Sequence, residues 1–493
     1  MSNIRVTYTG LFSFLFGIIS ILTGLVFTVI VTRSLSPTEF GSWGVIGTLV
    51  SYTLIMGSIV NYWSTREISR GEESGKTAIL FSSSFSIFAI AVYFLIQFFF
   101  TEQIDPLLLV FGVILVPIEF IKLELTALTH GYKPQNIEFS LIIFEISKII
   151  LALVLVYYFE YGVFGAITAT AIGSLASSIF LFFKAKPILS GKLQKNYIKK
   201  WLKLSWIPLF PKISGILTNL DVAVFTLITG SPIGIAYWAA SKSIGGFISH
   251  SSKINKALYP KLLGNGKEEI FNSNLTHVLY FAIPSMGIVL VFAKPALFIL
   301  NPEYVIAIDI LFFIAPLFFI TLLSYVFSQF LFGTEKIDLD KNSGFRDYVK
   351  SNLVTIPFAN LIRKSIYLFS LIIILFSFKD TATQIELVTY WVILGIITEI
   401  PFTIYLGLKI HFNHHLKFNF IPILKYALIS LVVCLITYFV LENSLVFHES
   451  IFDFIPVLLP YFVLTVSLYL IFTYIVDKNT QKLIKSIIKE FKK

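Results

Sequence analysis

The stretch GLFSFLFGIISILTGLVFTVIVTRSLSPTEFGSW, residues 10–43, carries the two signals that decide the fold. About 22 apolar residues from Gly10 to Val31 are enough for one helix across a bilayer core of roughly 30 Å. The run is too long for the apolar region of a signal peptide, and no Ala-x-Ala-like cleavage site follows it. We therefore expect this run to be the first membrane span and the Ser36–Pro37 turn to lead into the second.

The composition of the whole chain agrees with a membrane protein. Of 493 residues, 56% are hydrophobic and only 13% are charged, and the mean hydropathy is +0.84. A soluble protein of this length needs far more charge to cover its surface. The single cysteine, Cys434, lies in an apolar run and excludes an intrachain disulfide or a multi-cysteine metal site.

Runs of about 20 apolar residues recur along the chain and predict an all-α polytopic membrane protein with about 14 transmembrane helices. The predicted spans are 10–31, 41–63, 78–100, 106–128, 137–158, 162–183, 206–230, 233–254, 274–300, 303–332, 353–376, 385–410, 420–441 and 454–476.

Lysine and arginine are distributed very unevenly between the loops. Segments on the side of the N-terminus carry about 28 of them, whereas the opposite loops carry Arg33 and Lys379. Basic residues accumulate on the cytoplasmic side of membrane proteins. We therefore expect both termini in the cytoplasm and the chain in the cell membrane. The net charge of +10 then belongs to the membrane surface and is no sign of a nucleic-acid partner.

Two basic segments predict helices that lie in the cytoplasmic interface. In 192–205, Tyr197 and Trp201 alternate with lysines at helical spacing, and the C-terminal tail places Ile484, Ile487 and Phe491 in the same way. The alternative is that either segment is simply a solvated basic stretch. The predicted outer loops are short, so no extramembrane domain is expected.

The first hairpin has a counterpart in the middle of the chain. Residues 32–43 and 229–238 both place Ser-Pro, then Gly, then an aromatic residue after an apolar span that starts from the inside. Such a repeat favours two parallel six-helix lobes related by a pseudo-twofold axis along the membrane normal. We therefore predict an N-terminal lobe at 1–183, a basic linker at 184–205, a C-terminal lobe at 206–411, two extra spans at 412–476 and a basic tail at 477–493.

The hairpin motifs resemble a known family. The pattern around Arg33, Pro37, Glu39 and Gly41 is similar to the first-hairpin signature of the Wzx-type polysaccharide and O-antigen flippases. These flippases are part of the multidrug/oligosaccharidyl-lipid/polysaccharide exporter superfamily. Further matching positions, all within about residues 1–300, are Arg66, Gly131, Asp221, Gly234 and Tyr237.

The resemblance implies a flippase that carries a polyprenyl-(di)phosphate-linked oligosaccharide across the bilayer by alternating access. Its partners are then the lipid-linked oligosaccharide, the lipid bilayer, and the glycosyltransferases or polymerase of glycan assembly; we expect a monomer. No cofactor is expected apart from a proton or sodium gradient.

Charged residues inside the spans are the candidate functional residues, because each costs at least about 2.5–3.5 kcal/mol at the bilayer centre. A wet, cationic cavity is what a phosphate-bearing head group requires. The candidates for binding it are Lys242, Arg363, Lys364, Lys212, Lys148 and Lys122. Lys242, Arg363 and Lys364 have no carboxylate within one helical turn, and Lys242 shares a face with small residues.

Some of these charges have a simpler explanation. Glu119–Lys122 and Glu145–Lys148 are spaced i,i+3, so the alternative for each pair is a structural ion pair on one helix face. Lys212 is close enough to an inner end to reach the interface with its ammonium group. Candidates for binding a coupling ion are Asp221, Glu399 and Asp309, although pairing with a lysine from another helix is equally open.

Two other functions are compatible with a polytopic chain. A multidrug cation exporter of the same superfamily needs an acidic rather than a cationic cavity. A membrane glycan ligase or polymerase needs a large outer loop, where only His448 and Glu449 offer candidates. No catalytic triad, HExxH, P-loop or CxxC pattern occurs, so we predict a transporter rather than an enzyme, with no metal site.

Overall fold

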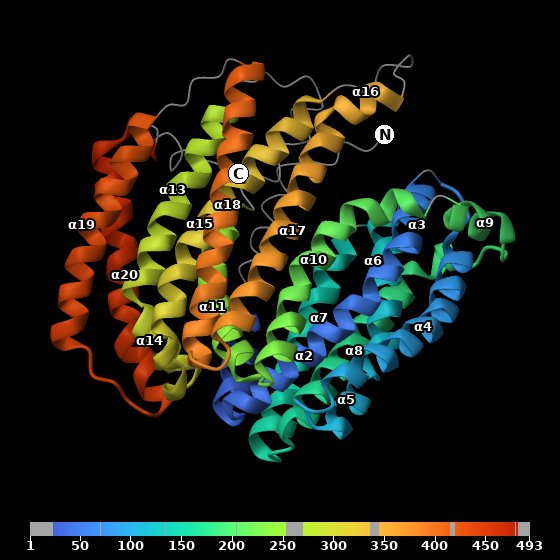
Figure 1. Cartoon of the computed structure of the whole chain (residues 1–493), viewed down its shortest axis with the longest axis horizontal. Coiled ribbons are helices and arrows are strands. Elements are labelled where there is room, and N and C mark those ends of the chain that lie inside the picture. The colour runs from blue at the N-terminus through green and yellow to red at the C-terminus, as the bar shows by residue number, and fades with distance from the viewer. Residues whose placement is uncertain are drawn as a thin grey trace. The chain divides into compact units, whose positions relative to one another are not determined.

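The computed structural model describes residues 23–481 except 70, 134, 204, 253–269, 336–344, 415–419 and 479. Every regular element in these residues is a helix, and no strand occurs among them (Figure 1). The prediction of an all-α polytopic protein is therefore confirmed. Residues 482–493 of the basic tail predicted at 477–493 lie outside the described residues.

The helices form two compact units, and the first comprises residues 1–239 and 368–387. After a helical segment at Thr23–Ser34, its elements are α2 (Pro37–Leu54), η1 (Ile55–Gly57), α3 (Ser58–Ser69), α4 (Gly75–Gln97), η2 (Phe98–Phe100), α5 (Pro106–Gly112), α6 (Leu115–Tyr132), α7 (Gln135–Ala152), the π-helical turn η3 (Leu153–Tyr158), α8 (Gly162–Leu189), α9 (Lys195–Lys203) and α10 (Trp206–Thr229).

The second unit comprises residues 240–367 and 388–493, so that α11 (Ile233–Ser249) and the helices α17 and α18 contribute to both units. Its elements are α13 (Ile270–Val291), α14 (Ala293–Leu300), η5 (Pro302–Ala307), α15 (Ile308–Thr334), α16 (Phe345–Lys350), α17 (Asn352–Phe378), α18 (Gln384–His414), α19 (Phe420–Ser444) and α20 (Ile451–Val476). The lobe boundaries expected from the internal repeat stay a prediction.

Eleven helical stretches in the described residues are long and apolar enough to cross a membrane, so the chain is a multi-pass membrane protein. They coincide with eleven of the fourteen predicted spans. The other three correspond to the Thr23–Ser34 helix, to α10, whose first half lies largely outside the described residues, and to α11, which is shorter and more polar. The first of these continues a predicted span that lies mostly outside the described residues.

The start of α2 explains the hairpin sequence. Ser36 is the N-cap and Glu39 completes a capping box, in which the Glu39 carboxylate accepts from the Ser36 backbone N–H at 2.9 Å and the Ser36 hydroxyl accepts from the Glu39 N–H at 3.3 Å. Pro37 occupies the first turn, where no N–H is needed. The counterpart Ser231 accepts from the Ile233 N–H at 3.3 Å at the start of α11.

The two matching hairpins touch within the first unit. A Cβ atom at Gly41 of α2 would lie 2.0 Å from the carbonyl oxygen of Pro232, so the backbones approach closely only because this residue is glycine. Gly131 at the end of α6 is similar, because a Cβ there would lie 2.6 Å from the carbonyl oxygen of Thr65 in α3. Gly41 and Gly131, which both match the family pattern, therefore allow close packing of the backbone.

Small residues also determine how the first unit is built around α8. This helix packs against α6 and α7, and α6 packs in turn against α3 and α4. The buried side of α8 is composed largely of glycine, alanine and serine, including Gly165, Ala169, Gly173 and Ser177. Small residues let membrane helices approach closely where lipid offers no hydrophobic driving force.

The predicted interfacial helix in the linker is α9, and its apolar side is docked on the first unit. Trp201 is fully buried among residues of α3, α4 and α6, and its indole stacks on Tyr197. The indole N–H of Trp201 lies 3.2 Å from both carboxylate oxygens of Glu67, and Lys200 forms an ion pair with the same carboxylate at 2.9 Å. Burial and a hydrogen bond to Glu72 raise the pKa of the Tyr197 phenol above its usual value.

The second unit has its core between α13, α15 and the last two helices. Helix α13 packs against both α15 and α19, and α19 packs against α20. Buried tyrosines join these helices: Tyr469 donates to the backbone of Tyr280 at 2.8 Å, and Tyr426 donates to Asp477 at 2.9 Å. Through these contacts the two final spans, α19 and α20, are part of this core.

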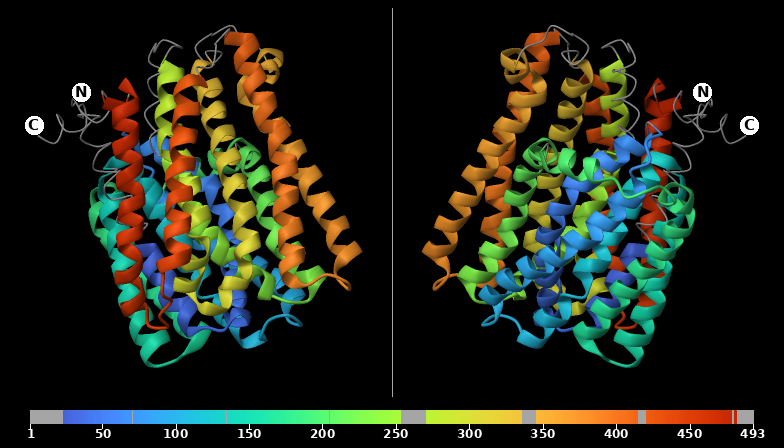
Figure 2. Two further views of the ribbon diagram at one scale, coloured as in Figure 1. Left: turned by 90° about the vertical axis from the view of Figure 1, so that its left-hand side faces the viewer. Right: turned by 90° about the vertical axis from the view of Figure 1, so that its right-hand side faces the viewer.

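Figure 2 shows α17 and α18 as two long helices joined by a short turn.

Candidate functional site

Each unit holds a cluster of charged side chains inside its apolar helices. In the first unit, Lys122 of α6 lies 3.3 Å from Glu119 one turn earlier and donates to the Ser174 hydroxyl of α8 at 3.1 Å. Ser174 itself donates to Glu119. The two charged side chains are only about one fifth exposed, at 20% and 19%. A hydroxyl from a neighbouring helix therefore completes the predicted i,i+3 pair.

The second predicted pair lies beside the first. Lys148 of α7 is 2.9 Å from Glu145, and both side chains are almost buried. The ammonium groups of Lys122 and Lys148 lie over the same ring, that of Phe144, at 3.8 and 4.6 Å from its centre. Lys148 also lies 4.4 Å from the centre of the Phe27 ring. Both intrahelical pairs are confirmed, and together they form one cluster of two lysines and two glutamates around an aromatic ring, which we call the lysine cluster.

Glu124 is a buried carboxyl group held by neutral partners. The Ser64 hydroxyl donates to it at 2.8 Å, and the Asn61 side chain, oriented with its amide nitrogen toward the carboxyl, lies 2.6 Å away. The residue is fully buried. The sequence could have singled out Glu124, because no lysine or arginine lies three or four positions away to form an ion pair on the same helix.

In the second unit, Arg363 and Glu399 form an ion pair between α17 and α18. Arg363 also donates from Nη2 to the Asn360 side chain at 2.7 Å and lies over the Phe402 ring at 4.8 Å. The side chains are 12% and 5% exposed. Arg363 has no carboxylate within one turn of its own helix, and its partner comes from a different helix. We call this group the arginine cluster.

Hydroxyl groups extend the arginine cluster to α15. Ser324 donates to Glu399 at 2.5 Å and lies 3.1 Å from the hydroxyl of Thr403, one turn after Glu399. The Thr403 hydroxyl also donates to the backbone carbonyl of Glu399 at 3.0 Å. The sequence assigned Glu399 to ion coupling and Arg363 to substrate binding, whereas the structure brings the two together.

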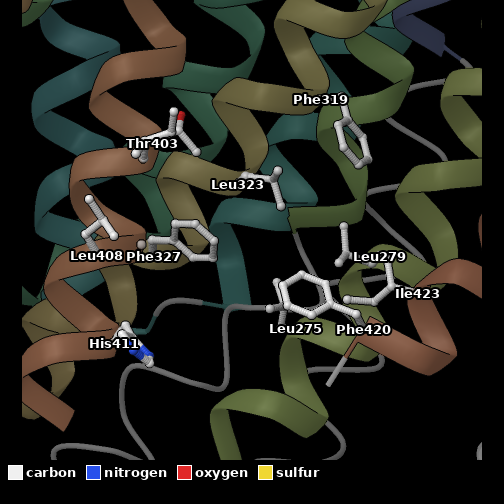
Figure 3. Close-up of a pocket in the computed structure, with 12 residues that line it drawn as sticks. Leu275, Leu279, Phe319, Leu323, Phe327, Thr403, Leu408, His411, Phe420 and Ile423 are labelled. Atoms are coloured by element: carbon white, nitrogen blue, oxygen red, sulfur yellow. The ribbon is translucent and has the colours of Figure 1, made fainter. Parts of the chain in front are cut away.

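A cavity of about 500 Å³ opens beside the arginine cluster in the same unit (Figure 3). It runs along α18 from Thr403 past Gly407 to His411, and Phe319, Leu323 and Phe327 of α15 form part of its wall. Leu275 and Leu279 of α13 and Phe420 and Ile423 of α19 complete the apolar lining. Because Ile404, Leu408 and Phe420 are exposed at its rim, the cavity is open at the surface of the unit. Thr403 belongs to both the cavity and the arginine cluster.

The remaining predicted binding residues are Lys242, Lys364 and Lys212. Lys242 of α11 is exposed, and Gly246 one turn later faces open space. Lys364 lies over the Tyr367 ring at 5.3 Å. The side chain of Lys212 lies outside the described part of α10. These three residues stay predictions as ligands of a phosphate.

The remaining ion-coupling candidates differ in burial. Asp221 of α10 is 5% exposed, accepts from the backbone N–H of Val222 at 2.8 Å and has further partners. Asp309 is exposed in the first turn of α15. Among the described residues, no three or more His, Cys, Asp or Glu side chains gather in a group suited to a metal ion.

The signature residues of the hairpins lie at the ends of helices. Arg33 is in the last turn of the Thr23–Ser34 helix, and Tyr237 is near the start of α11. Arg66 lies over the Tyr62 ring at 4.8 Å near the end of α3. At Gly234, a Cβ would lie 2.4 Å from the Phe225 ring. Sequence reasoning missed Glu67, next to Arg66, whose carboxylate anchors α9.

The fold matches solved membrane transporters, although no protein-family model and no curated protein matches the sequence. A lipid II flippase, MurJ in an inward closed conformation, gives a TM-score of 0.60 at 17% identity and covers 95% of this chain and 99% of its own. An inward-facing multidrug resistance MATE family transporter of the MOP superfamily gives 0.59 at 13%, covering 81% and 96%. A Vibrio cholerae MATE transporter gives 0.52 at 14%, covering 82% and 96%. At these identities the likeness concerns the fold: the chain has the helical fold of the MOP-superfamily transporters.

Proposed function

We propose that this chain is a flippase that moves a polyprenyl-(di)phosphate-linked oligosaccharide from the cytoplasmic to the outer leaflet by alternating access. The observation that carries the proposal is the presence of Lys122, Lys148 and Arg363 inside apolar helices, in two clusters with carboxylates and hydroxyls. Ammonium and guanidinium groups bind phosphate strongly where water is scarce.

The cost of these charges supports a functional role. A charged side chain at the bilayer centre costs at least about 2.5–3.5 kcal/mol, and ionisable residues in spans usually mark a substrate or ion pathway. A purely structural protein of this kind would be at least as stable with apolar residues at these positions. In a flippase, each buried lysine or arginine exchanges its glutamate partner for the phosphate of the substrate, and this exchange is the function of the buried charges.

The apolar cavity supports an amphiphilic substrate. Its lining is hydrocarbon and aromatic apart from Thr403 and His411, and its size lies within the range of about 300–1,000 Å³ that is typical of ligand sites. Through Thr403 and Ser324 it adjoins the arginine cluster. A lipid tail in the cavity and a phosphate at the arginine are compatible with one elongated molecule.

One feature of the comparisons supports a lipid substrate over a soluble drug. The match to the lipid II flippase covers 95% of the chain, whereas the match to the inward-facing multidrug transporter covers 81%. The alternative function, a multidrug cation exporter, is favoured by one observation: Glu124 is a buried carboxyl with neutral partners in the described structure. Export of an organic cation would require such an acidic group, so transport of a dye cation that is lost in Glu124→Gln would favour this alternative.

A membrane enzyme that joins or polymerises glycans is less well supported. The connections between the described spans at 159–161, 230–232 and 379–383 are short, and a site for glycan chemistry needs a larger outer loop. We therefore infer a non-enzymatic role in the cell membrane, with both termini in the cytoplasm. The inferred partners are the lipid-linked oligosaccharide and the glycosyltransferases or polymerase of its assembly.

The experiment is to find which leaflet holds lipid-linked glycan in cells that lack this gene. We expect accumulation in the cytoplasmic leaflet and loss of the surface glycan, both restored by the wild-type gene. Restoration by a Lys122→Ala/Lys148→Ala variant as complete as by the wild type would refute the role of the lysine cluster. Accumulation in the outer leaflet would refute the flippase and support a ligase or polymerase.

A further inference from the structure

Arg363 uses only part of its hydrogen-bonding capacity. Of the five N–H groups of a guanidinium, one on Nη1 faces Glu399 and one on Nη2 faces Asn360 at 2.7 Å. The Nε–H is buried without an acceptor. A buried donor left without a partner is costly and uncommon in a structural ion pair. A larger anion with several oxygens would satisfy this guanidinium more fully than one carboxylate oxygen does.

Glu399 has partners that suit its neutral form as well as its ionised form. Its Oε1 accepts from Ser324, which α15 holds in place, and its Oε2 faces Arg363. A proton on Oε2 leaves the Ser324 hydrogen bond intact. It removes only the attraction to the guanidinium.

Among the residues that the structure describes, the three helices that form the arginine cluster carry few other charged groups. Helix α17 also carries Lys364 and Tyr367, and α18 carries no further acidic or basic residue between Glu386 and Lys409. Helix α15 presents Ser324, and its only charged residue is Asp309 in the first turn. His411 lies two turns beyond Thr403 in the wall of the cavity. Glu399 is therefore the group whose protonation most directly changes the charge balance at Arg363.

We infer that Arg363 is a phosphate-binding site and that Glu399 controls it: a proton taken up by Glu399 releases the guanidinium to bind an anionic phosphate in place of the carboxylate. This inference rests on the proposed function, because it names the coupling ion and the residue that receives it. The buried charge stays balanced throughout, since the guanidinium exchanges one anion for another while the displaced carboxylate is neutralised.

Thermodynamic linkage makes the exchange measurable. If phosphate binding requires a proton on Glu399, phosphate promotes proton uptake and low pH promotes phosphate binding by the same factor. One coupled proton changes the affinity by at most about tenfold per pH unit. Affinity is then highest at low pH and begins to fall once the pH rises far enough for Glu399 of the unliganded protein to lose its proton.

The test is a binding titration on the purified full chain in detergent. The probe is an isoprenyl methyl phosphodiester, whose single negative charge does not change across the pH range, and the matching isoprenyl alcohol is the uncharged control. The affinity of the wild type should fall several-fold between about pH 6 and about pH 8. Calorimetry in buffers of different ionisation enthalpy should show uptake of up to about one proton for each probe bound.

Substitutions distinguish the role of Arg363 from that of Glu399. In Glu399→Gln, binding should be as tight at high pH as at low pH and should take up no proton. Arg363→Gln should weaken binding at every pH. Because this variant leaves Glu399 without its cation, the double variant Arg363→Gln/Glu399→Gln is the second test: it carries neither buried charge and should bind as weakly. Glu386→Gln, which removes an exposed carboxylate from the same helix, should keep the pH dependence of the wild type.

Two results would overturn the inference. Binding by the wild type that is independent of pH and equal to that of Glu399→Gln would exclude the exchange and leave the flippase proposal in place. Binding of the phosphodiester no stronger than that of the alcohol in every variant would exclude the phosphate site. The leaflet experiment then decides separately whether the chain is a flippase.

Discussion

At the scale of single residues, the structure shows how polytopic helices hold charge. Glu119 and Lys122 lie on one face of α6 and need only Ser174 from α8 to complete their hydrogen bonds. Arg363 and Glu399 instead meet across two helices, with Ser324 of a third helix as their common support. In both clusters a serine hydroxyl donates to the carboxylate, so we expect the stability of the protein to be sensitive to substitution of these serines.

Ser324→Ala should destabilise the second unit. It removes a hydrogen bond to a charged group, which is worth about 1.5–3 kcal/mol, and leaves one oxygen of the buried Glu399 carboxylate without a donor. We expect a lower thermal midpoint of the purified protein, measured by intrinsic fluorescence. Ser377→Ala, which removes an exposed hydroxyl bonded only to its own helix, is the matched control. Equal midpoints for the two variants would show that Ser324 does not support the carboxylate.

The sequence predicts one kind of charge pair and not the other. Spacing i,i+3 places both members of the Glu119–Lys122 and Glu145–Lys148 pairs on one helix face, so these contacts follow from helix geometry alone. The Arg363–Glu399 pair depends on the rotation and register of α17 against α18. Neither quantity is encoded in the hydropathy of either helix.

At the scale of elements, capping and glycine decide where helices begin and how closely they pack. The Ser36–Glu39 capping box and Pro37 at the first turn of α2 are readable from the sequence. The requirement for glycine at position 41 is not readable from the sequence, because it depends on the backbone of Pro232, which is distant in the chain.

Gly41→Ala should therefore be more damaging than an ordinary glycine substitution in a helix. The added methyl group collides with a carbonyl oxygen, and overpacking of this kind typically costs about 1–3 kcal/mol. The measurement is the thermal midpoint together with the yield of monodisperse protein. Gly47→Ala in the same helix is the control, since no atom lies within 4 Å of its added Cβ. A Gly41→Ala protein as stable as Gly47→Ala would contradict the close approach of α2 and Pro232.

Helix α9 offers a second test at this scale. Trp201→Ala should cost about 3–5 kcal/mol of local stability, because it empties a fully buried site. Trp201→Phe keeps most of the ring contacts and loses mainly the hydrogen bond to Glu67. Limited proteolysis should cut the 190–205 segment fastest in Trp201→Ala, more slowly in Trp201→Phe and slowest in the wild type. Equal cleavage rates in all three would show that α9 is not docked.

At the scale of the whole molecule, hydropathy predicted the fold well. Eleven of the predicted spans coincide with long apolar helices, because a bilayer-spanning helix needs little beyond length and an apolar surface. The span at α11 is harder to recognise, since Lys242 and several glycines and serines interrupt its apolar run. Hydropathy carries no information on the cavity between α13, α15, α18 and α19.

The orientation of the chain follows from loop charge and is open to direct measurement. The only native cysteine, Cys434, is buried, so cysteines introduced at single loop positions report cleanly on access. Lys379→Cys should react with a membrane-impermeant thiol reagent in intact cells, whereas Ser190→Cys should react only after the membrane is opened. The opposite pattern would invert the topology and place the termini outside.

The most direct test of the central claim is translocation by the purified chain in liposomes. Vesicles would contain a fluorescent polyprenyl-diphosphate-linked oligosaccharide, and a membrane-impermeant glycosidase added outside would report which molecules have reached the outer leaflet. We predict that the pool protected in empty vesicles becomes cleavable with the wild type and stays protected with the Lys122→Ala/Lys148→Ala variant. A protected pool that is unchanged by the folded wild-type protein, with an imposed proton or sodium gradient as well as without one, would contradict the account.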